Sequence, residues 1–303
     1  MPAPGRGAGR KDLQPGQVSQ LRVHDLATGT DRLVLQTDEL IEAPNWTPDD
    51  RLVVNGGGCL WQIPAVGGEL AHIGTGEIRT VNNDHVLSPD GTAIYFSAAG
   101  HLYRIPIGGG NPVQVSNDQP DGSGYTYWLH GITPDGGTLA YVAVEPLGDD
   151  PRGRRNLATI PAAGGPDRLL SDGAVPFDGP EYSPDGVWLY YNSEEAARTP
   201  GHAQLFRMPA EGGAAEQLTF DERVNWFPHL DPQGESVLYI SYEPGTVSHP
   251  ADVDVTLRIV PVSGGEPRDV VHLFGGQGTL NVNSWAPDSS AFAYVAYPFA
   301  ESA

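Results

Sequence analysis

A short turn motif recurs along the whole chain and limits what the chain can fold into. In the copy at residues 177–191, a short strand segment runs through Ser183-Pro184-Asp185-Gly186 into a second strand segment rich in aromatic residues. Proline presets one backbone angle of such a turn, and glycine takes the positive one. The turn proline occurs six times, at intervals of 41 to 55 residues: Pro48, Pro89, Pro134, Pro184, Pro232 and Pro287. A period in the forties made of short strands is typical of β-propeller blades.

A second motif lies between the turns. A short apolar segment that ends in proline, at residues 60–64 in the first copy and 205–209 in the fourth, is followed by a glycine pair. We therefore expect four antiparallel strands in each unit. Strand A ends at the proline turn, strand B follows it, strand C ends at the second proline, and strand D follows the glycine pair. The A and B segments are almost continuously apolar, which suits sheets covered on both faces.

The two ends of the chain supply the parts that the repeats lack. Residues 20–23 and 32–35 read as a C–D pair, while residues 285–297 form an A–B pair with nothing after it. We predict an all-β fold: a six-bladed β-propeller of four-stranded antiparallel blades, closed by N-terminal strands that complete the last blade. Residues 1–18 are polar and rich in Gly and Pro, and we expect a disordered tail there. Residues 19–303 then form a single domain.

The amino-acid composition limits which kinds of partner the protein can bind. The formal net charge is −21 with 17 basic residues, and such an acidic surface disfavours both nucleic acid and membrane partners. Acidity keeps a turn-rich protein in solution, and it also attracts cations or cationic ligands. The first residues contain no apolar signal region, and the single cysteine, Cys59, leaves no internal disulfide. We therefore expect a cytoplasmic location.

Polar residues gather at the start of the A strands, which open on one face around the central channel. The longer B–C connections, at residues 145–156, 194–203 and 243–255, lie on that face too, and binding sites favour long loops over a rigid scaffold. Trp128 is the candidate stacking platform. The candidate ligand-binding residues are Glu42, Asn83, Asp84, His85, Trp128, His130, Asp178, Glu181, Asn225, His229 and Asn283.

Four of these residues could hold a divalent metal ion or supply acid–base chemistry: His85, His130, Glu181 and His229. Their register raises a difficulty. His85 and His130 stand four residues before their turn proline, whereas His229 stands three before. Side chains alternate along a strand, so one histidine should point elsewhere unless a bulge corrects it. The alternative is that the polar ring only satisfies its own hydrogen bonds.

The turn motifs carry a family resemblance. Residues 45–49, 181–186 and 283–288 resemble the WD40-like β-propeller repeat of the TolB family. The resemblance covers most of residues 19–297 and implies a six-bladed propeller, in a stand-alone form without the separate N-terminal domain of TolB. Oligogalacturonate lyases also have TolB-like propellers, and they hold a metal with histidines at the mouth. His85, His130 and His229 are similar in kind, but no residue-by-residue correspondence follows.

Two functions are compatible with the sequence. The first is a binding or scaffolding propeller whose ligand, a peptide or small molecule, sits at the channel mouth. The alternative is a metal-dependent carbohydrate-active enzyme, a lyase or hydrolase acting on an acidic sugar. No nucleophile elbow, phosphate loop or dinucleotide fingerprint is present. No catalytic residue is therefore assigned, and a divalent metal ion is the one candidate cofactor. The partner is expected to be a protein or small molecule of unknown identity.

Overall fold

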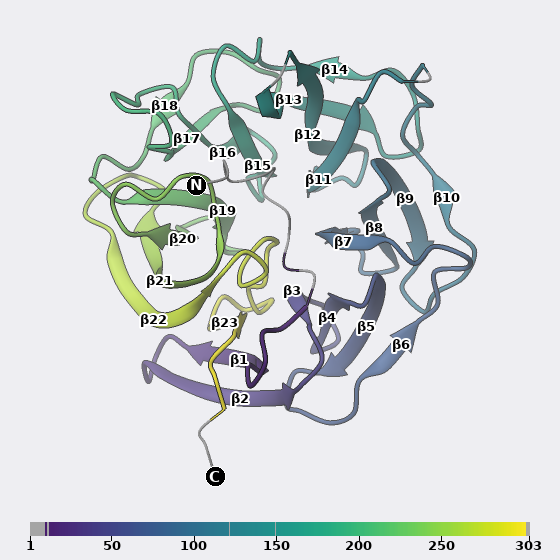
Figure 1. Cartoon of the computed structure of the whole chain (residues 1–303), viewed down its shortest axis with the longest axis vertical. Coiled ribbons are helices and arrows are strands. Elements are labelled where there is room, and N and C mark those ends of the chain that lie inside the picture. Colours follow the sequence, from purple (N-terminus) through teal and green to yellow (C-terminus); the bar gives the residue numbers. More distant parts are fainter. Residues whose placement is uncertain (1–9, 11, 121, 149, 301–303) are drawn as a thin grey trace.

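Six antiparallel sheets stand around a common centre as the blades of a propeller (Figure 1). This computed structural model describes residues 10, 12–120, 122–148 and 150–300. In each of the first five blades, four strands follow one another in chain order outward from the centre. The predicted all-β fold and the number of blades are confirmed.

The strand bounds follow the repeats. The first blade contains β3 (Glu42–Trp46), β4 (Arg51–Gly56), β5 (Cys59–Pro64) and β6 (Ala71–Ile73). The second contains β7 (Val81–Leu87), β8 (Ala93–Ala98), β9 (His101–Pro106) and β10 (Val113–Gln114). The third contains β11 (Thr126–Ile132), β12 (Thr138–Leu147), β13 (Asp150–Pro161) and β14 (Arg168–Leu169). The fourth contains β15 (Phe177–Tyr182), β16 (Trp188–Ser193), β17 (Gln204–Pro209) and β18 (Glu216–Gln217). The fifth contains β19 (Val224–Leu230), β20 (Ser236–Tyr242), β21 (Ala251–Pro261) and β22 (Arg268–Gly276).

The sixth blade joins the two ends of the chain. It comprises β1 (Ser19–Asp25), β2 (Thr30–Thr37) and β23 (Ala291–Ala296), in the order β2-β1-β23. Strand β1 pairs antiparallel with β23, so that Leu21 faces Val295 across the ladder. A bridge between Trp285 and Phe292 marks the innermost position of this blade. The predicted closure of the ring by the N-terminal strands is confirmed.

The hydrophobic core is divided among the spaces between neighbouring blades. Leu52 and Val54 of β4 pack in a cluster with the sixth blade, whereas Val53, which points the other way, packs in a cluster with the second blade. All three side chains are fully buried. Alternation along the strand therefore buries both faces of the sheet. This explains why the A and B segments read as continuous apolar runs.

The proline turns also contact one another between blades. Ser88 Oγ donates a 2.6 Å hydrogen bond to Asp90, whose carboxylate accepts the backbone N–H of Thr92. Gly91 has a φ of +67°, and a Cβ atom there would lie 3.0 Å from the ring of Pro48 in the preceding turn. Glycine is thus required both by its backbone angle and by this close approach.

The start of the chain behaves differently from the expected tail. Residues 1–9 and 11 lie outside the described residues, whereas Arg10 and Gln17 are buried against the propeller. Gln17 Nε2 donates to the backbone oxygen of Tyr297 at 2.9 Å. The described part of this segment therefore has fixed contacts, and in Figure 1 its purple trace starts near the middle of the ring. No helix long and apolar enough to cross a bilayer occurs among the residues that the structure describes.

Candidate ligand-binding site at the hub

Polar side chains of the innermost strands meet across neighbouring blades, and we call this set the hub. It comprises Glu42, Asn45, Asn83, Asp84, His85, His130, Asp178, Glu181, His229 and Asn283. All of these are buried except Asn283, which is half-buried. The hub therefore gathers most of the residues predicted from the sequence.

Bulges bring these side chains together. Five innermost strands shift register against the neighbouring strand, each within the stretch that holds the hub residues: Glu42/Asn45, Val81/His85, Leu129/Gly131, Asp178/Glu181 and Trp226/His229. An extra residue bends a strand and turns a side chain that would otherwise face away. The different spacing of His229 therefore does not exclude it from the hub.

Glu181 is the most heavily bonded acid of the hub. Its Oε2 atom lies 2.6 Å from His229 Nδ1, and its Oε1 atom accepts the N–H of Leu230 at 2.8 Å and the amide of Asn283 at 2.7 Å. His229 Nε2 lies 3.2 Å from the backbone oxygen of Leu280. Both ring nitrogens therefore face acceptors, and the histidine bridges the Glu181 carboxylate and the Leu280 backbone oxygen.

The same chain of contacts continues to His85. The Asn45 amide donates to the backbone oxygen of Asn283 at 2.9 Å, and Asn45 Oδ1 accepts from His85 Nδ1 at 2.7 Å. Burial lowers the pKa of His85 to about 3, so its ring is neutral. Its Nε2 atom is left as a bare acceptor without a hydrogen-bond partner in the described part of the chain.

A second cluster surrounds Asp178. Its Oδ1 atom lies 3.2 Å from His130 Nε2, and its Oδ2 atom accepts from Arg155 at 2.9 Å. Burial alone would raise the pKa of Asp178, but the His130 hydrogen bond and the Arg155 charge hold it well below its usual range. Burial opposes the charge on His130, yet its bond to Asp178 and the nearby Asp84 raise its pKa. This cluster is therefore charged in the folded protein.

Two hub acids, Glu42 and Asp84, are buried with fewer neighbouring charges and donors to stabilise their ionised forms. Burial raises the pKa of Glu42 to about 7, and the Asn55 hydrogen bond and the Arg10 charge offset this only in part. Burial also raises the pKa of Asp84 to about 6, against the charge of His130. Both acids titrate near neutral pH, which is a property often found at functional sites.

The structure adds His249, which the sequence placed in a loop near the channel. This side chain is buried, with its ring 4.4 Å from that of Trp226 and 5.1 Å from that of Phe227. Its Nε2 atom lies 4.0 Å from Asp178, and Nδ1 lies 2.6 Å from Gln277 Oε1. Burial lowers the pKa of His249 to about 4. An isolated loop histidine gave no periodic signal by which this packing could be predicted.

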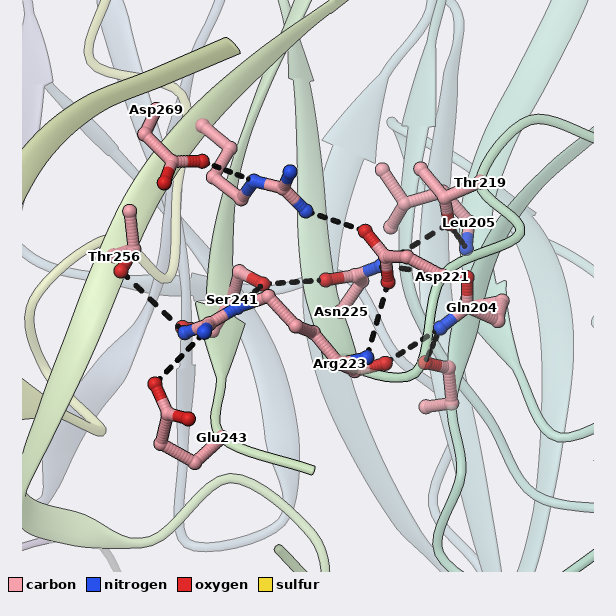
Figure 2. A network of polar contacts seen from close by, with 12 residues as sticks. Gln204, Leu205, Thr219, Asp221, Arg223, Asn225, Ser241, Glu243, Thr256 and Asp269 are labelled. Carbon is pink, nitrogen blue, oxygen red and sulfur yellow. Dashed lines mark hydrogen bonds and ion pairs between the residues drawn. The ribbon is translucent and has the colours of Figure 1, made fainter. Parts of the chain in front are cut away.

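Two predicted site residues lie apart from the hub. Figure 2 shows Asn225 within a network beside Arg223, where its amide donates to Asp221 at 3.1 Å and its Oδ1 accepts from Ser241 at 2.7 Å. Its polar atoms are therefore used inside the protein. Trp128 is 38% exposed, and its Nε1 donates to Thr126. Among the described residues, no hydrogen bond or ring contact joins Trp128 to a hub residue.

The four predicted metal ligands do not converge. Glu181 and His229 are paired, whereas His85 bonds Asn45 and His130 bonds Asp178. Across the described ranges, no three His, Cys, Asp or Glu side chains are grouped as a metal ion requires. The residues therefore do not fit a metal site in this arrangement.

A pocket also lies between the B–C loops of the fourth and fifth blades. Thr199, His202, Glu222 and Gly245 contribute to its wall, and no hub residue does. It is distinct from the polar hub.

These features define a six-bladed β-propeller with a buried, charged hub. No family model matches the chain. An uncharacterized protein of Agrobacterium fabrum (strain C58) is 35% identical over 286 residues, which is 92% of each chain. A solved structure from Agrobacterium tumefaciens that carries the provisional name TolB is 34% identical, with a TM-score of 0.83 over 93% of this chain and 99% of that one. The chain belongs to the family of TolB-like six-bladed β-propellers.

More distant structures share the fold alone. TolB from Acinetobacter baumannii is 17% identical, with a TM-score of 0.58 over 88% of this chain and 66% of that one. An oligogalacturonate lyase in complex with manganese is 14% identical, with a TM-score of 0.56 over 89% of this chain and 75% of the lyase. The same propeller thus occurs in proteins with different names and activities.

Proposed function

We propose that this protein is a non-catalytic binding propeller whose ligand, a peptide or small molecule, contacts the hub. The observation that carries the proposal is the concentration of buried ionisable groups in the hub. Glu42, Asp84, Asp178 and Glu181 are all buried there together with three histidines.

The hydrophobic core does not depend on these groups. The apolar clusters between blades already bury both faces of the sheets. Burying a charge is costly unless it is paired, and Glu42 and His85 each keep a buried polar atom without a partner in the described part of the protein. Unpaired buried polar groups often mark a place where a ligand completes the hydrogen bonding. A cytoplasmic location remains a prediction.

The alternative function is a metal-dependent enzyme acting on an acidic sugar. The Glu181–His229 pair favours it, because an acid and a histidine at 2.6 Å can exchange a proton. The scattered positions of the predicted metal ligands weigh against it.

The two functions can be separated on one preparation. Protein purified under mild conditions is analysed by native mass spectrometry and by elemental analysis, beside Asp178→Asn and the exposed control Asp269→Asn. A bound organic ligand or partner that is lost in D178N and kept in D269N supports the binding function. A stoichiometric divalent metal, lost in His130→Ala, supports the enzyme instead. Identical binding by wild type and D178N contradicts the proposed site.

A further inference from the structure

The guanidinium of Arg10 occupies a built site beside the hub. Its Nη2 atom lies 2.7 Å from Asp252 Oδ1, and its Nη1 atom donates to the backbone oxygen of Gln277 at 3.3 Å. The guanidinium carbon lies 3.5 Å from the ring centroid of Tyr297. An acid, a carbonyl and an aromatic face thus surround one cation, and the Arg10 side chain is only 2% exposed. This combination recognises a guanidinium with more specificity than a carboxylate alone.

The site is an integral part of the propeller. Asp252 belongs to β21, and Tyr297 follows β23, so the fifth and sixth blades both contribute. Gln17 reinforces the arrangement, because its Nε2 atom donates to the same Asp252 oxygen at 2.7 Å. Burial raises the pKa of Tyr297 well above its usual value, so its ring stays neutral under the cation.

Arg10 is held to the propeller by its own side chain, and Gln17 fixes the other end of the segment. Among residues 10 and 12–17, Leu13 is the apolar side chain that joins a core cluster. Ordering each residue of such a segment costs roughly 1–2 kcal/mol of backbone entropy. Residues 12 and 14–16 are exposed, so release of Arg10 would lose mainly the contacts of its guanidinium and of Leu13.

The fit between Arg10 and its surroundings is incomplete. The charge of Arg10 acts on Glu42 and lowers its pKa. The Oε1 atom of Glu42 nevertheless has no hydrogen-bond partner among the described residues. The same is true of Asn55 Oδ1 next to it and of Arg10 Nε. Glu42 Oε1 and the Tyr297 hydroxyl lie on the same side of Gly278, where a Cβ atom would be 2.5 and 2.6 Å from them. The unused acceptors are suited to a ligand with N–H donors beyond those that Arg10 supplies.

We propose that this position is a guanidinium-binding site, that the side chain of Arg10 is its resident occupant, and that an arginine-bearing peptide binds here by displacing it. The inference rests on the proposed binding function and gives its ligand a chemical class. The peptide's guanidinium would lie between Asp252 and Tyr297, with its backbone N–H groups toward Glu42.

The first test removes the occupant and returns it in solution. Arg10→Ala is melted with N-acetyl-argininamide and with N-acetyl-citrullinamide, which has the same shape and no charge. The arginine compound at about ten times its Kd should raise the Tm of R10A by about 2–4 °C. It should raise the Tm of wild type less, because wild type must first release its own arginine. The double variant R10A/Asp252→Asn should show no rise.

The second test uses the wild-type chain. Lys11 is the one lysine of the sequence and directly follows Arg10, so a lysine-specific endoprotease reports release of the segment. N-acetyl-argininamide should speed this single cut at least ~threefold, because cleavage follows the population of the released form. N-acetyl-citrullinamide should leave the rate unchanged, which also controls for effects on the protease.

The outcomes are decisive in either direction. Equal effects of the two compounds, or rescue that persists in R10A/D252N, overturn the proposal. If R10A does not fold, Arg10→Gln takes its place, and the proteolysis of wild type still decides. The binding function itself is tested by D178N, so a failed rescue with a ligand that is still lost in D178N refutes only the guanidinium site.

Discussion

Glu181 and His229 face each other across the boundary between the fourth and fifth blades, with 2.6 Å between Oε2 and Nδ1. The carboxylate also holds the N–H of Leu230, so a side chain of one blade bonds both the side chain and the backbone of the next. This link fixes the spacing of the hub at the point where two bulged strands meet. It makes the pair a structural element of the hub as well as a candidate contact for a ligand.

The first prediction concerns this pair. Glu181→Gln places an amide where three donors converge and leaves His229 without its carboxylate partner. Because a buried pair is broken, the free energy of unfolding should fall by about 3 kcal/mol. Glu216→Gln is the matched control, since Glu216 pairs with Arg207 on an exposed edge, and it should cost less than ~1 kcal/mol. Equal losses in urea unfolding of the two variants would contradict the role of the pair.

The second prediction concerns pH. The pKa of Glu42 is raised from 4.5 to about 7 in the folded protein, so the folded state binds more protons than the unfolded state between these values. The contribution of Glu42 to stability is therefore full below pH ~4.5 and is lost as pH rises through 7. Between pH 5 and pH 8 the stability of wild type should fall relative to Glu42→Gln by ~2.5 kcal/mol. All other ionisable groups are the same in both proteins, so the difference reports on Glu42. Parallel pH profiles would refute this.

The third prediction tests closure of the ring. Leu21 of β1 is fully buried in a core cluster, whereas Leu33 on the adjoining strand β2 is 45% exposed. Leu21→Ala should lower the free energy of unfolding by about 2–5 kcal/mol because it leaves a cavity in the closing blade. Leu33→Ala should change it by less than ~0.5 kcal/mol. The comparison, by denaturant unfolding, fails if the two substitutions cost the same.

The fourth prediction concerns the bulge before Glu181. Gly179 has a φ of +60°, and a Cβ atom there would meet Asn192 and Phe227 at 3.1 Å. Gly179→Ala should therefore cost about 2–3 kcal/mol, from the backbone angle and from the crowding together. Gly29→Ala is the control, with a φ of +66° and open space around it, and it should cost only ~1 kcal/mol. Thermal melting of the two variants should show this order, and the reverse order would exclude crowding as the cause.

The architecture could be predicted because its causes are local and repeated. Each turn proline and each glycine acts within a few residues, so six copies report the same strand pattern. The closure of the ring by β1 and β23 could be predicted because the N-terminal C–D pair and the C-terminal A–B pair each lacked the other half of a blade. The side-chain partners of the hub could not be read in this way, because they depend on contacts between blades.

A sequence signal for some of the bulges in the innermost strands is a second proline near the turn proline. Three hub residues stand three residues before their turn proline: Asn45, Glu181 and His229. In each case another proline stands four residues before the same turn proline: Pro44, Pro180 and Pro228. The residues ahead of these prolines, Ala43, Gly179 and Phe227, all have positive φ values. A second proline at that position therefore marks the bulge that changes the register. Arg10 carried no comparable signal, because its partner Asp252 is remote in the sequence and its neighbours read as a tail.

The pairing of β1 with β23 also sets an order of events during synthesis. Strands β1 and β2 emerge from the ribosome first, yet β1 lacks its inner neighbour until β23 has been translated, near the end of the chain. During that interval the N-terminal hairpin presents a bare ladder of backbone donors and acceptors. Until its last strand has been translated, the nascent protein must therefore avoid pairing of this edge with other chains. It can do so by binding a holdase chaperone or by completing translation rapidly.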